Sequence, residues 1–188
     1  MKTKKILIEG YAYTASGILF NLMDPDERQI TIDDIATGLT NNCRWNGQVR
    51  RFYSVAEHSL RCWWMYKGEA GKTIKPQFPW QLHYEKNVGL ALLLHDSEEA
   101  YWGDTIRPIK SLLPARLTVK MAELRYTIMR KYGVTEDYQE IIDHYDNLML
   151  EWEFENVVTH ENYLHVKSML PDENTKKMFL DAFFLLSS

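Results

Sequence analysis

The stretch LLLHDSEEAYWGDTIRPIK, residues 92–110, joins an apolar helix to a cluster of acidic side chains. Three leucines lead directly into His95 and Asp96, and three more carboxylates follow before the stretch ends. Burying an unpaired carboxylate costs free energy, so a core helix that ends this way needs a cation, a metal or a hydrogen-bond donor close by. The stretch therefore indicates a functional site built onto a core helix.

The composition bounds the class of protein. The chain has 188 residues, of which 45% are hydrophobic, so we expect residues 1–188 to form a single domain with a packed core. Its net charge of -4, with mixed signs, argues against a nucleic-acid surface, which carries a basic patch. The two cysteines, Cys43 and Cys62, do not suggest a disulfide framework, so the expected location is the reducing cytoplasm. No run approaches the roughly 18 apolar residues of a membrane span, and the N-terminus lacks a signal-peptide core.

Hydrophobic periodicity and capping signals predict a helical protein with a β-hairpin at its start. Residues 4–22 are expected to form two short strands around an Ala-Ser-Gly turn. Capping boxes at Thr31–Asp34 and Ser54–Glu57 are expected to open two helices, and 68–80 is expected to be a loop. Further helices are expected over 88–102 with Asn87 as its cap, 114–132, 135–158 and 174–186. The predicted fold is all-α, a helical bundle with a short N-terminal β-hairpin.

A helical stripe turns part of the acidic cluster toward the core. On a continuous helix through 88–102, His95 and Glu99 follow two core positions on one face, and Asp96 lies beside them. Glu98 points away from this face and is expected to be solvated. The stripe therefore predicts that one imidazole and two carboxylates converge inside the bundle.

Two more predicted helices offer matching side chains. His58 and Asp146 each lie on the apolar stripe of their own helix. Taken alone, the first could be an ordinary core histidine and the second the partner of an arginine. Together with His95 and Asp96 they supply two imidazole nitrogens and two carboxylate oxygens, which suit Mn, Fe, Co, Zn or Mg. We therefore expect a shared divalent metal with open positions for water and substrate.

Several motifs in combination resemble one known family. They are CRWNG at 43–47, SVAEHS at 54–59, HDxxE at 95–99 and GD at 103–104, followed by a helical aspartate at 146. This combination resembles the HD-domain metal-dependent phosphohydrolases, and is most similar to the small single-domain 5′-deoxynucleotidases and viral dATP triphosphohydrolases. The resemblance implies that the bundle is of the HD-domain type. It also implies the metal ligands, which are His58, His95, Asp96 and Asp146.

The resemblance further implies roles for residues around these ligands. Glu99 would be the catalytic acidic residue that orients or deprotonates the attacking water, with an ion pair behind the ligands as the alternative. Arg44 would contact a phosphate, and Trp45 would stack on a base or sugar, with core filling as its alternative. Asp104 would accept a hydrogen bond from a sugar 3′-hydroxyl, and Lys110 would lie near the phosphates.

The expected function is metal-dependent hydrolysis of the 5′-phosphate or triphosphate of a deoxynucleotide, with dATP or dAMP implied by the resemblance alone. The sequence does not distinguish a monophosphate substrate from a triphosphate substrate. A triphosphate needs more cationic groups around it, which could be supplied by Arg44, Arg50, Arg51, Arg107 and Lys110. The alternatives are a non-catalytic metal- and nucleotide-binding sensor and an HD nuclease acting on single-stranded nucleic acid. The complete ligand set argues against the sensor, and the acidic charge balance argues against the nuclease. The expected partners are a small-molecule nucleotide and further copies of the chain in a homo-oligomer.

Overall fold

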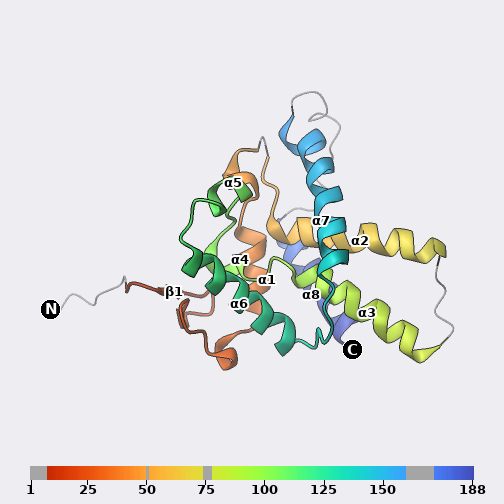
Figure 1. Ribbon diagram of the computed structural model, residues 1–188, viewed down its shortest axis with the longest axis horizontal. Coiled ribbons are helices and arrows are strands. Elements are labelled where there is room, and N and C mark those ends of the chain that lie inside the picture. The colour runs from red at the N-terminus through yellow and green to blue at the C-terminus, as the bar shows by residue number, and fades with distance from the viewer. Residues whose placement is uncertain (1–7, 50, 74–77, 160–171) are drawn as a thin grey trace.

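The structure is a computed structural model that describes residues 8–49, 51–73, 78–159 and 172–188 of the chain. It is a bundle of helices preceded by a two-stranded antiparallel hairpin (Figure 1). The strands are β1 (Tyr11–Tyr13) and β2 (Leu19–Asn21), and the helices are α1 (Ile32–Asn41), α2 (Val55–Thr73), α3 (Pro79–Leu94), α4 (Glu99–Trp102), α5 (Arg107–Lys110), α6 (Ala115–Lys131), α7 (Gln139–Glu153) and α8 (Asp172–Ser187). Short helical turns lie at η1 (Glu27–Gln29), η2 (Trp45–Gly47) and η3 (Phe154–Val158). The predicted class, an all-α bundle with a short N-terminal hairpin, is confirmed.

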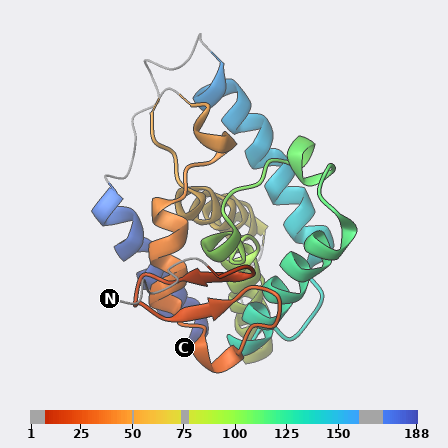
Figure 2. The ribbon, with the colours of Figure 1, turned by 90° about the vertical axis from the view of Figure 1, so that its left-hand side faces the viewer.

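The hairpin is fixed to the bundle through the start of α1. Figure 2 looks onto β1 and β2, and their register pairs Ala12 with Phe20, which is fully buried. In the turn between the strands, the backbone N–H and the hydroxyl of Ser16 both donate to the carboxylate of Asp34, each at 2.8 Å. Thr31 caps α1 as predicted, since its hydroxyl oxygen accepts from the Asp34 N–H at 3.1 Å. One buried carboxylate therefore holds the hairpin turn and the helix start together.

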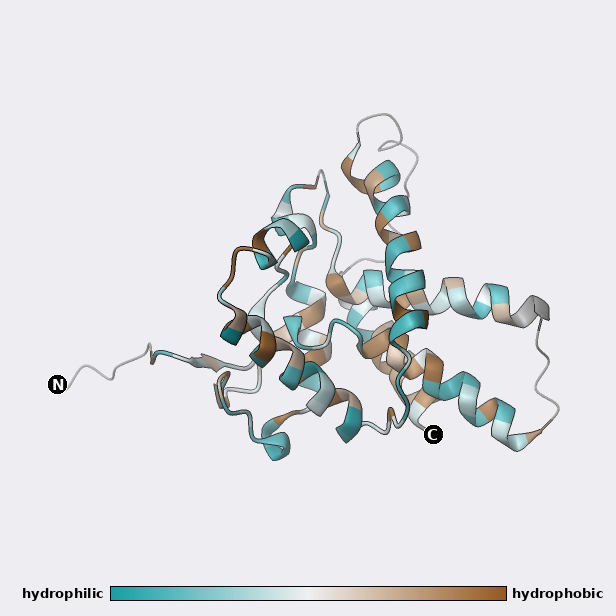
Figure 3. Ribbon diagram, viewed as in Figure 1, coloured by the Kyte–Doolittle hydropathy of each residue, from teal (hydrophilic) through white to brown (hydrophobic). Residues whose placement is uncertain are grey.

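The C-terminal half of α3 forms the centre of the core. Residues 87–94 of this helix are all buried, and α2 and α8 pack against it. Apolar residues gather where these helices cross, while polar residues follow the outer faces (Figure 3). On α8, Phe179 and Phe183 face the core, whereas Phe184 and Leu185 are more than half exposed. In the described part of the chain, no helix combines the length and the apolar character that crossing a membrane requires.

Two predicted boundaries on either side of 68–80 are wrong. Helix α2 continues to Thr73 and α3 already begins at Pro79, while residues 74–77 lie outside the described part of the chain. Asn87 is therefore inside α3 and does not cap it. Its side-chain amide instead donates to the Gly133 carbonyl at 2.6 Å and accepts from the Thr135 N–H at 3.3 Å. Helix α7 begins four residues later than predicted, at Gln139.

The predicted continuous helix through 88–102 is also wrong. Helix α3 ends at Leu94, and the chain turns tightly before α4. In this turn the Ser97 N–H donates to the Leu94 carbonyl at 3.0 Å and the Glu99 N–H donates to the Asp96 carbonyl at 3.0 Å. Such three-residue spacing rotates each residue further around the axis than an α-helix does, so side chains change faces. Glu98, predicted to be solvated, is consequently buried at 1% exposure.

We predict that Asp34→Asn lowers the free energy of unfolding at pH 7 by about 2 kcal/mol, because it removes a charged acceptor of three side-chain and backbone donors. Burial raises the pKa of Asp34, but the hydrogen bonds from Ser16 and Thr31 outweigh it and hold the pKa below its ordinary value. The contribution is thus present above pH 4 and is lost as pH falls through the folded-state pKa. Urea unfolding at several pH values should show the deficit of the variant shrinking toward acid pH.

The matched control is Asp33→Asn, which makes the same chemical change at a residue paired on the surface with Lys176 at 2.8 Å. It should cost less than about 1 kcal/mol. Equal losses for the two variants would show that Asp34 has no special structural role.

We also predict opposite effects for two helical glycines. At Gly38 a Cβ atom would lie 2.7–2.9 Å from backbone and Cβ atoms of Ala100, so α1 and α4 approach each other too closely for a side chain. Gly38→Ala should therefore lower the free energy of unfolding by about 1–3 kcal/mol. Gly68→Ala, with no atom within 4 Å of the added Cβ, should raise it by up to about 1 kcal/mol through helix propensity. Stabilisation by both would contradict the close packing of α1 on α4.

Candidate metal centre and adjoining cavity

Four side chains converge between α2, the turn after α3, and α7. The Nε2 atoms of His58 and His95 lie 3.2 Å apart. An Asp96 carboxylate oxygen lies 3.3 Å from the His95 nitrogen, and an Asp146 oxygen lies 3.3 Å from the His58 nitrogen. The structure thus brings together all four residues predicted as ligands. His58 and Asp146 lie within helices that were predicted, whereas His95 and Asp96 follow the end of α3 and do not lie on the continuous helix that was predicted.

The outer nitrogens of both imidazoles are already engaged. His95 Nδ1 donates to the Leu92 carbonyl at 2.8 Å, and His58 Nδ1 lies 2.6 Å from a Glu153 carboxylate oxygen. A carbonyl can only accept, so the neutral His95 ring directs the lone pair of Nε2 inward, and an ionised Glu153 imposes the same tautomer on His58. Two lone pairs and two carboxylates then face one another, an arrangement that needs a proton or a cation. Such outer hydrogen bonds are the rule for histidines that bind metals.

The close approach of these acceptor groups favours the binding of a proton at the centre. Burial lowers the pKa of His95, but the charge of Asp96 and its hydrogen bond outweigh burial and raise the pKa to about 9. The centre therefore attracts positive charge strongly. The same four groups could hold a divalent cation in place of the proton, because two nitrogens and two oxygens form a common donor set for such ions.

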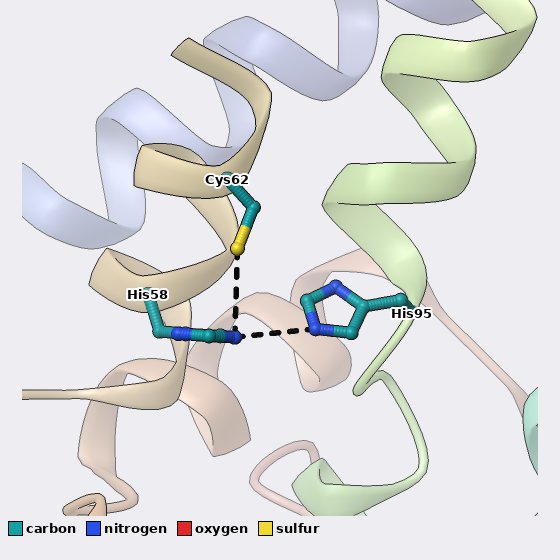
Figure 4. A group of neighbouring side chains, drawn as sticks. All are labelled: His58, Cys62 and His95. Atoms are coloured by element: carbon teal, nitrogen blue, oxygen red, sulfur yellow. Dashed lines mark hydrogen bonds between the residues drawn. The ribbon is translucent and has the colours of Figure 1, made fainter. Parts of the chain in front are cut away.

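Cys62 adds a sulfur atom to the same centre. It lies one helical turn after His58, and Figure 4 shows its sulfur and the His95 ring converging on one His58 nitrogen, with the sulfur at 3.6 Å. His58, Cys62 and His95 are all buried and could hold a metal as a second, overlapping donor set. The thiol is oriented to donate to the Tyr145 carbonyl at 3.9 Å, as a protonated sulfur would. The spacing of four from His58 was the sequence signal for this residue.

Arg44 and Trp45 meet the centre through carboxylates. Arg44, which was predicted to contact a phosphate, is 8% exposed and lines the cavity. Its guanidinium donates to Asp96 at 3.3 Å and to Glu153 at 3.1 Å. Burial lowers the pKa of Arg44, and the two carboxylates more than reverse this effect. Trp45 is half-buried with a left-handed φ of 60°, and its indole N–H donates to Glu153 at 3.1 Å. Its ring lines a cavity, so core filling does not describe its position.

Sequence reasoning missed Glu153. This carboxylate is fully buried at the end of α7, where it accepts from His58, Arg44 and Trp45. It follows Asp146 by seven residues on the same helix, and a seven-residue spacing returns to the same helical face. That spacing was the available signal.

Glu99 and Asp104 flank the centre on the other side. Glu99 is 5% exposed, lines the cavity, and one of its oxygens has no hydrogen-bond partner among the residues that the structure describes. Burial, followed by the charges of Asp96 and Asp104, raises the pKa of Glu99 well above its ordinary value. Asp104 follows a glycine turn as predicted and accepts from the backbone N–H of Asn46 at 3.2 Å. Both predicted carboxylates therefore face the same space.

That space is a cavity of about 480 Å³ lined by three of the four donors, His95, Asp96 and Asp146, with His58 fully buried behind them. Its volume is within the range of small-molecule sites. The cationic residues in its lining are Arg44, Arg107, Lys110 and Arg125. The cavity could thus accommodate an anionic small molecule against the donors.

The cationic side chains Arg107 and Lys110 of the cavity wall have different carboxylate partners. Arg107 donates to the second oxygen of Asp146 at 2.7 Å, while its side chain remains 63% exposed. Lys110, expected near the phosphates, lines the cavity, and its ammonium lies 3.9 Å from the buried Glu98. Arg125 on α6 was not anticipated, and Arg50 lies outside the described residues.

The two other histidines within the described ranges do not reach the centre. His83 and His144 are exposed on α3 and α7. His160 and His165, to which the sequence assigned no role, lie outside the described residues.

Comparison with known proteins gives relatives whose activities are uncharacterized. No protein-family model matches the chain. It is 40% identical over 100 residues to an uncharacterized protein of Rhodobacter capsulatus, an alignment that covers 52% of this chain and 45% of that protein. It is 30% identical over 140 residues to the uncharacterized protein YfdR of Escherichia coli K12, covering 74% of this chain and 68% of YfdR. From this second alignment, the chain belongs to the same protein family as YfdR.

Proposed function

We propose that the protein is a metal-dependent phosphohydrolase that removes phosphate or triphosphate from the 5′ position of a deoxynucleotide. The observation that carries the proposal is the convergence of His58, His95, Asp96 and Asp146 at the edge of a cavity that Glu99 also lines. The HD-type motifs of the sequence support the same reading. Bringing several hydrogen-bond acceptors together in a buried centre costs free energy unless they share a cation.

The four donors are the residues that would hold the metal. When bound, a divalent ion such as Mn, Co, Zn, Fe or Mg supplies positive charge that polarises a phosphoryl group. Glu153 and the Leu92 carbonyl hold the two imidazoles with their Nε2 atoms inward. Two nitrogens and two carboxylates leave coordination positions for water and substrate.

In the proposed reaction, Glu99 orients the attacking water and accepts its proton. A new bond forms between the water oxygen and phosphorus, and the bond from phosphorus to the leaving oxygen breaks. The leaving oxygen takes up a proton from the surrounding water. The position of Glu99 on the cavity wall, with one carboxylate oxygen free of hydrogen-bond partners among the described residues, suits this role.

The cavity wall suits a nucleotide. Lys110 and Arg107, which both line the cavity, would bind phosphate oxygens. Trp45 would stack on the base or sugar, and Asp104 would accept a hydrogen bond from a 3′-hydroxyl. The choice of deoxyadenosine nucleotides rests on the family resemblance.

The proposal extends to the setting of the protein. Two free cysteines suit a reducing cytoplasm. Phe184 and Leu185 on the outer face of α8 are 58% and 54% exposed, which supports a homo-oligomer in which this face is covered.

The donor set can be tested with cobalt. We predict that Asp146→Asn and Asp96→Asn each weaken Co²⁺ binding by about tenfold or more, while Cys62→Ser leaves the affinity unchanged. Isothermal titration gives the affinities, and the visible spectrum of bound Co²⁺ reports whether sulfur is a ligand. Loss of binding in the Cys62 variant alone would assign the metal to the His58–Cys62–His95 set.

The activity can be tested by phosphate release from deoxynucleoside and ribonucleoside mono-, di- and triphosphates with Mn, Co, Mg or Zn. We predict metal-dependent turnover that Asp96→Ala abolishes and that Glu99→Gln lowers by about 10²–10⁴-fold with the metal still bound. Separating phosphate, pyrophosphate and triphosphate identifies the bond that is cleaved. Glu140→Gln, the same change at an exposed residue of α7, is the control. No turnover of any nucleotide by the metal-loaded protein would favour a sensor.

A further inference from the structure

Glu153 lies at the junction between the two halves of the site. It ends α7, where the helix changes to the π-helical turn η3, and its side chain is fully buried. One carboxylate oxygen lies 2.6 Å from His58 Nδ1. The other accepts from Arg44 Nε and from the indole N–H of Trp45, both at 3.1 Å.

The three side chains that contact Glu153 belong to two different parts of the site. His58 belongs to the donor centre, whereas Arg44 and Trp45 form part of the cavity wall. Arg44 also reaches the centre directly through Asp96, at 3.3 Å. Trp45 has no such second route among the described residues, so its polar connection to the donor centre runs through Glu153.

The geometry also explains the choice of a carboxylate at this position. Three donors approach one buried group, and an ionised carboxylate offers lone pairs on two oxygens to receive them. A glutamine would present an N–H₂ group toward at least one of these donors. A buried group that faces its own kind of hydrogen-bond partner is destabilising, so the network depends on the charge as well as the shape.

We infer that Glu153 is a positioning residue that couples the metal centre to the substrate-facing wall. Through His58 it fixes the ring that points into the centre, and through Trp45 and Arg44 it fixes the wall on which a nucleotide would rest. The part of this inference that concerns substrate, its substrate half, rests on the proposed function. The part that concerns metal binding, its metal half, depends only on the donor centre. Metal binding at the centre and the orientation of Trp45 are therefore linked. The free energy by which metal binding favours the orientation of Trp45 equals the free energy by which that orientation favours metal binding.

The first test measures Co²⁺ affinity without any substrate. Glu153→Gln is expected to weaken Co²⁺ binding by about tenfold, since partners of metal-binding histidines contribute to that extent. Glu151→Gln, the same change at an exposed position of the same helix, should leave the affinity unchanged. Wild-type affinity in Glu153→Gln would overturn the inference.

The second test separates coupling from simple support of His58. Trp45→Phe removes the indole donor and should weaken Co²⁺ binding by about threefold in the wild-type background. In the Glu153→Gln background the same change should have no effect, because the connection is already broken. Equal effects of Trp45→Phe in both backgrounds, or none in the wild type, would overturn the coupling.

A variant that keeps the charge guards against misfolding. Glu153→Asp retains the carboxylate but shortens it by one methylene, so its Co²⁺ affinity should fall between those of the wild type and Glu153→Gln. If circular dichroism shows that Glu153→Gln is unfolded, Glu153→Asp takes its place in both tests. An aspartate variant that is folded and binds Co²⁺ as the wild type does, with an unchanged response to Trp45→Phe, would then refute the inference.

The substrate half has a separate readout. On a nucleotide that the wild type hydrolyses, Glu153→Gln should raise KM and lower kcat even at saturating Co²⁺, whereas Glu151→Gln should change neither. A normal KM and kcat at saturating metal would confine Glu153 to metal binding and overturn its link to substrate. If the wild type hydrolyses no nucleotide, the proposed function fails while the Co²⁺ measurements still decide the metal half.

Discussion

The mutual proximity of four acceptor groups is the constraint on which this structure depends. Two imidazole nitrogens 3.2 Å apart, with an aspartate oxygen 3.3 Å from each, form a centre that is unfavourable without positive charge. The protein places this centre at the end of its core helix α3, where the side chains of His58 and His95 are almost completely buried. The neighbouring groups offset part of the repulsion between these acceptors and fix the geometry. Arg44 lies between two carboxylates, and Glu153 and a backbone carbonyl hold the outer nitrogens of the two imidazoles.

The surrounding packing serves the same arrangement. Gly38 allows α1 to approach the backbone of Ala100, which directly follows Glu99. Asn87 ties the middle of α3 to the segment that precedes α7, the helix that carries Asp146 and Glu153. Contacts that look merely structural therefore set the positions of the groups that would carry the chemistry.

Sequence reasoning identified the residue types of the centre but not the geometry that joins them. His58, His95, Asp96 and Asp146 could be found because buried polar residues on apolar stripes are conspicuous. The path of the chain after Leu94 could not, because a tight turn and a continuing helix share the same local preferences. That error also misplaced Glu98, which is buried. Glu153 was missed because a lone glutamate near the end of a helix resembles a solvated one, and its seven-residue spacing from Asp146 was the one sequence signal that pointed to the same helical face.

The residues of this centre come from distant parts of the chain. The two metal-binding candidates His58 and His95 are 37 residues apart, and Glu153, which contacts the outer nitrogen of His58, lies 95 residues after it. They meet only once α2, α3 and α7 have all assembled, so the unfolded chain has no equivalent of this centre. Any ion that occupies it therefore holds the folded state against unfolding, in proportion to the logarithm of its concentration over its dissociation constant. Where an ion does occupy the centre, its supply during synthesis would govern how much folded protein survives in a cell.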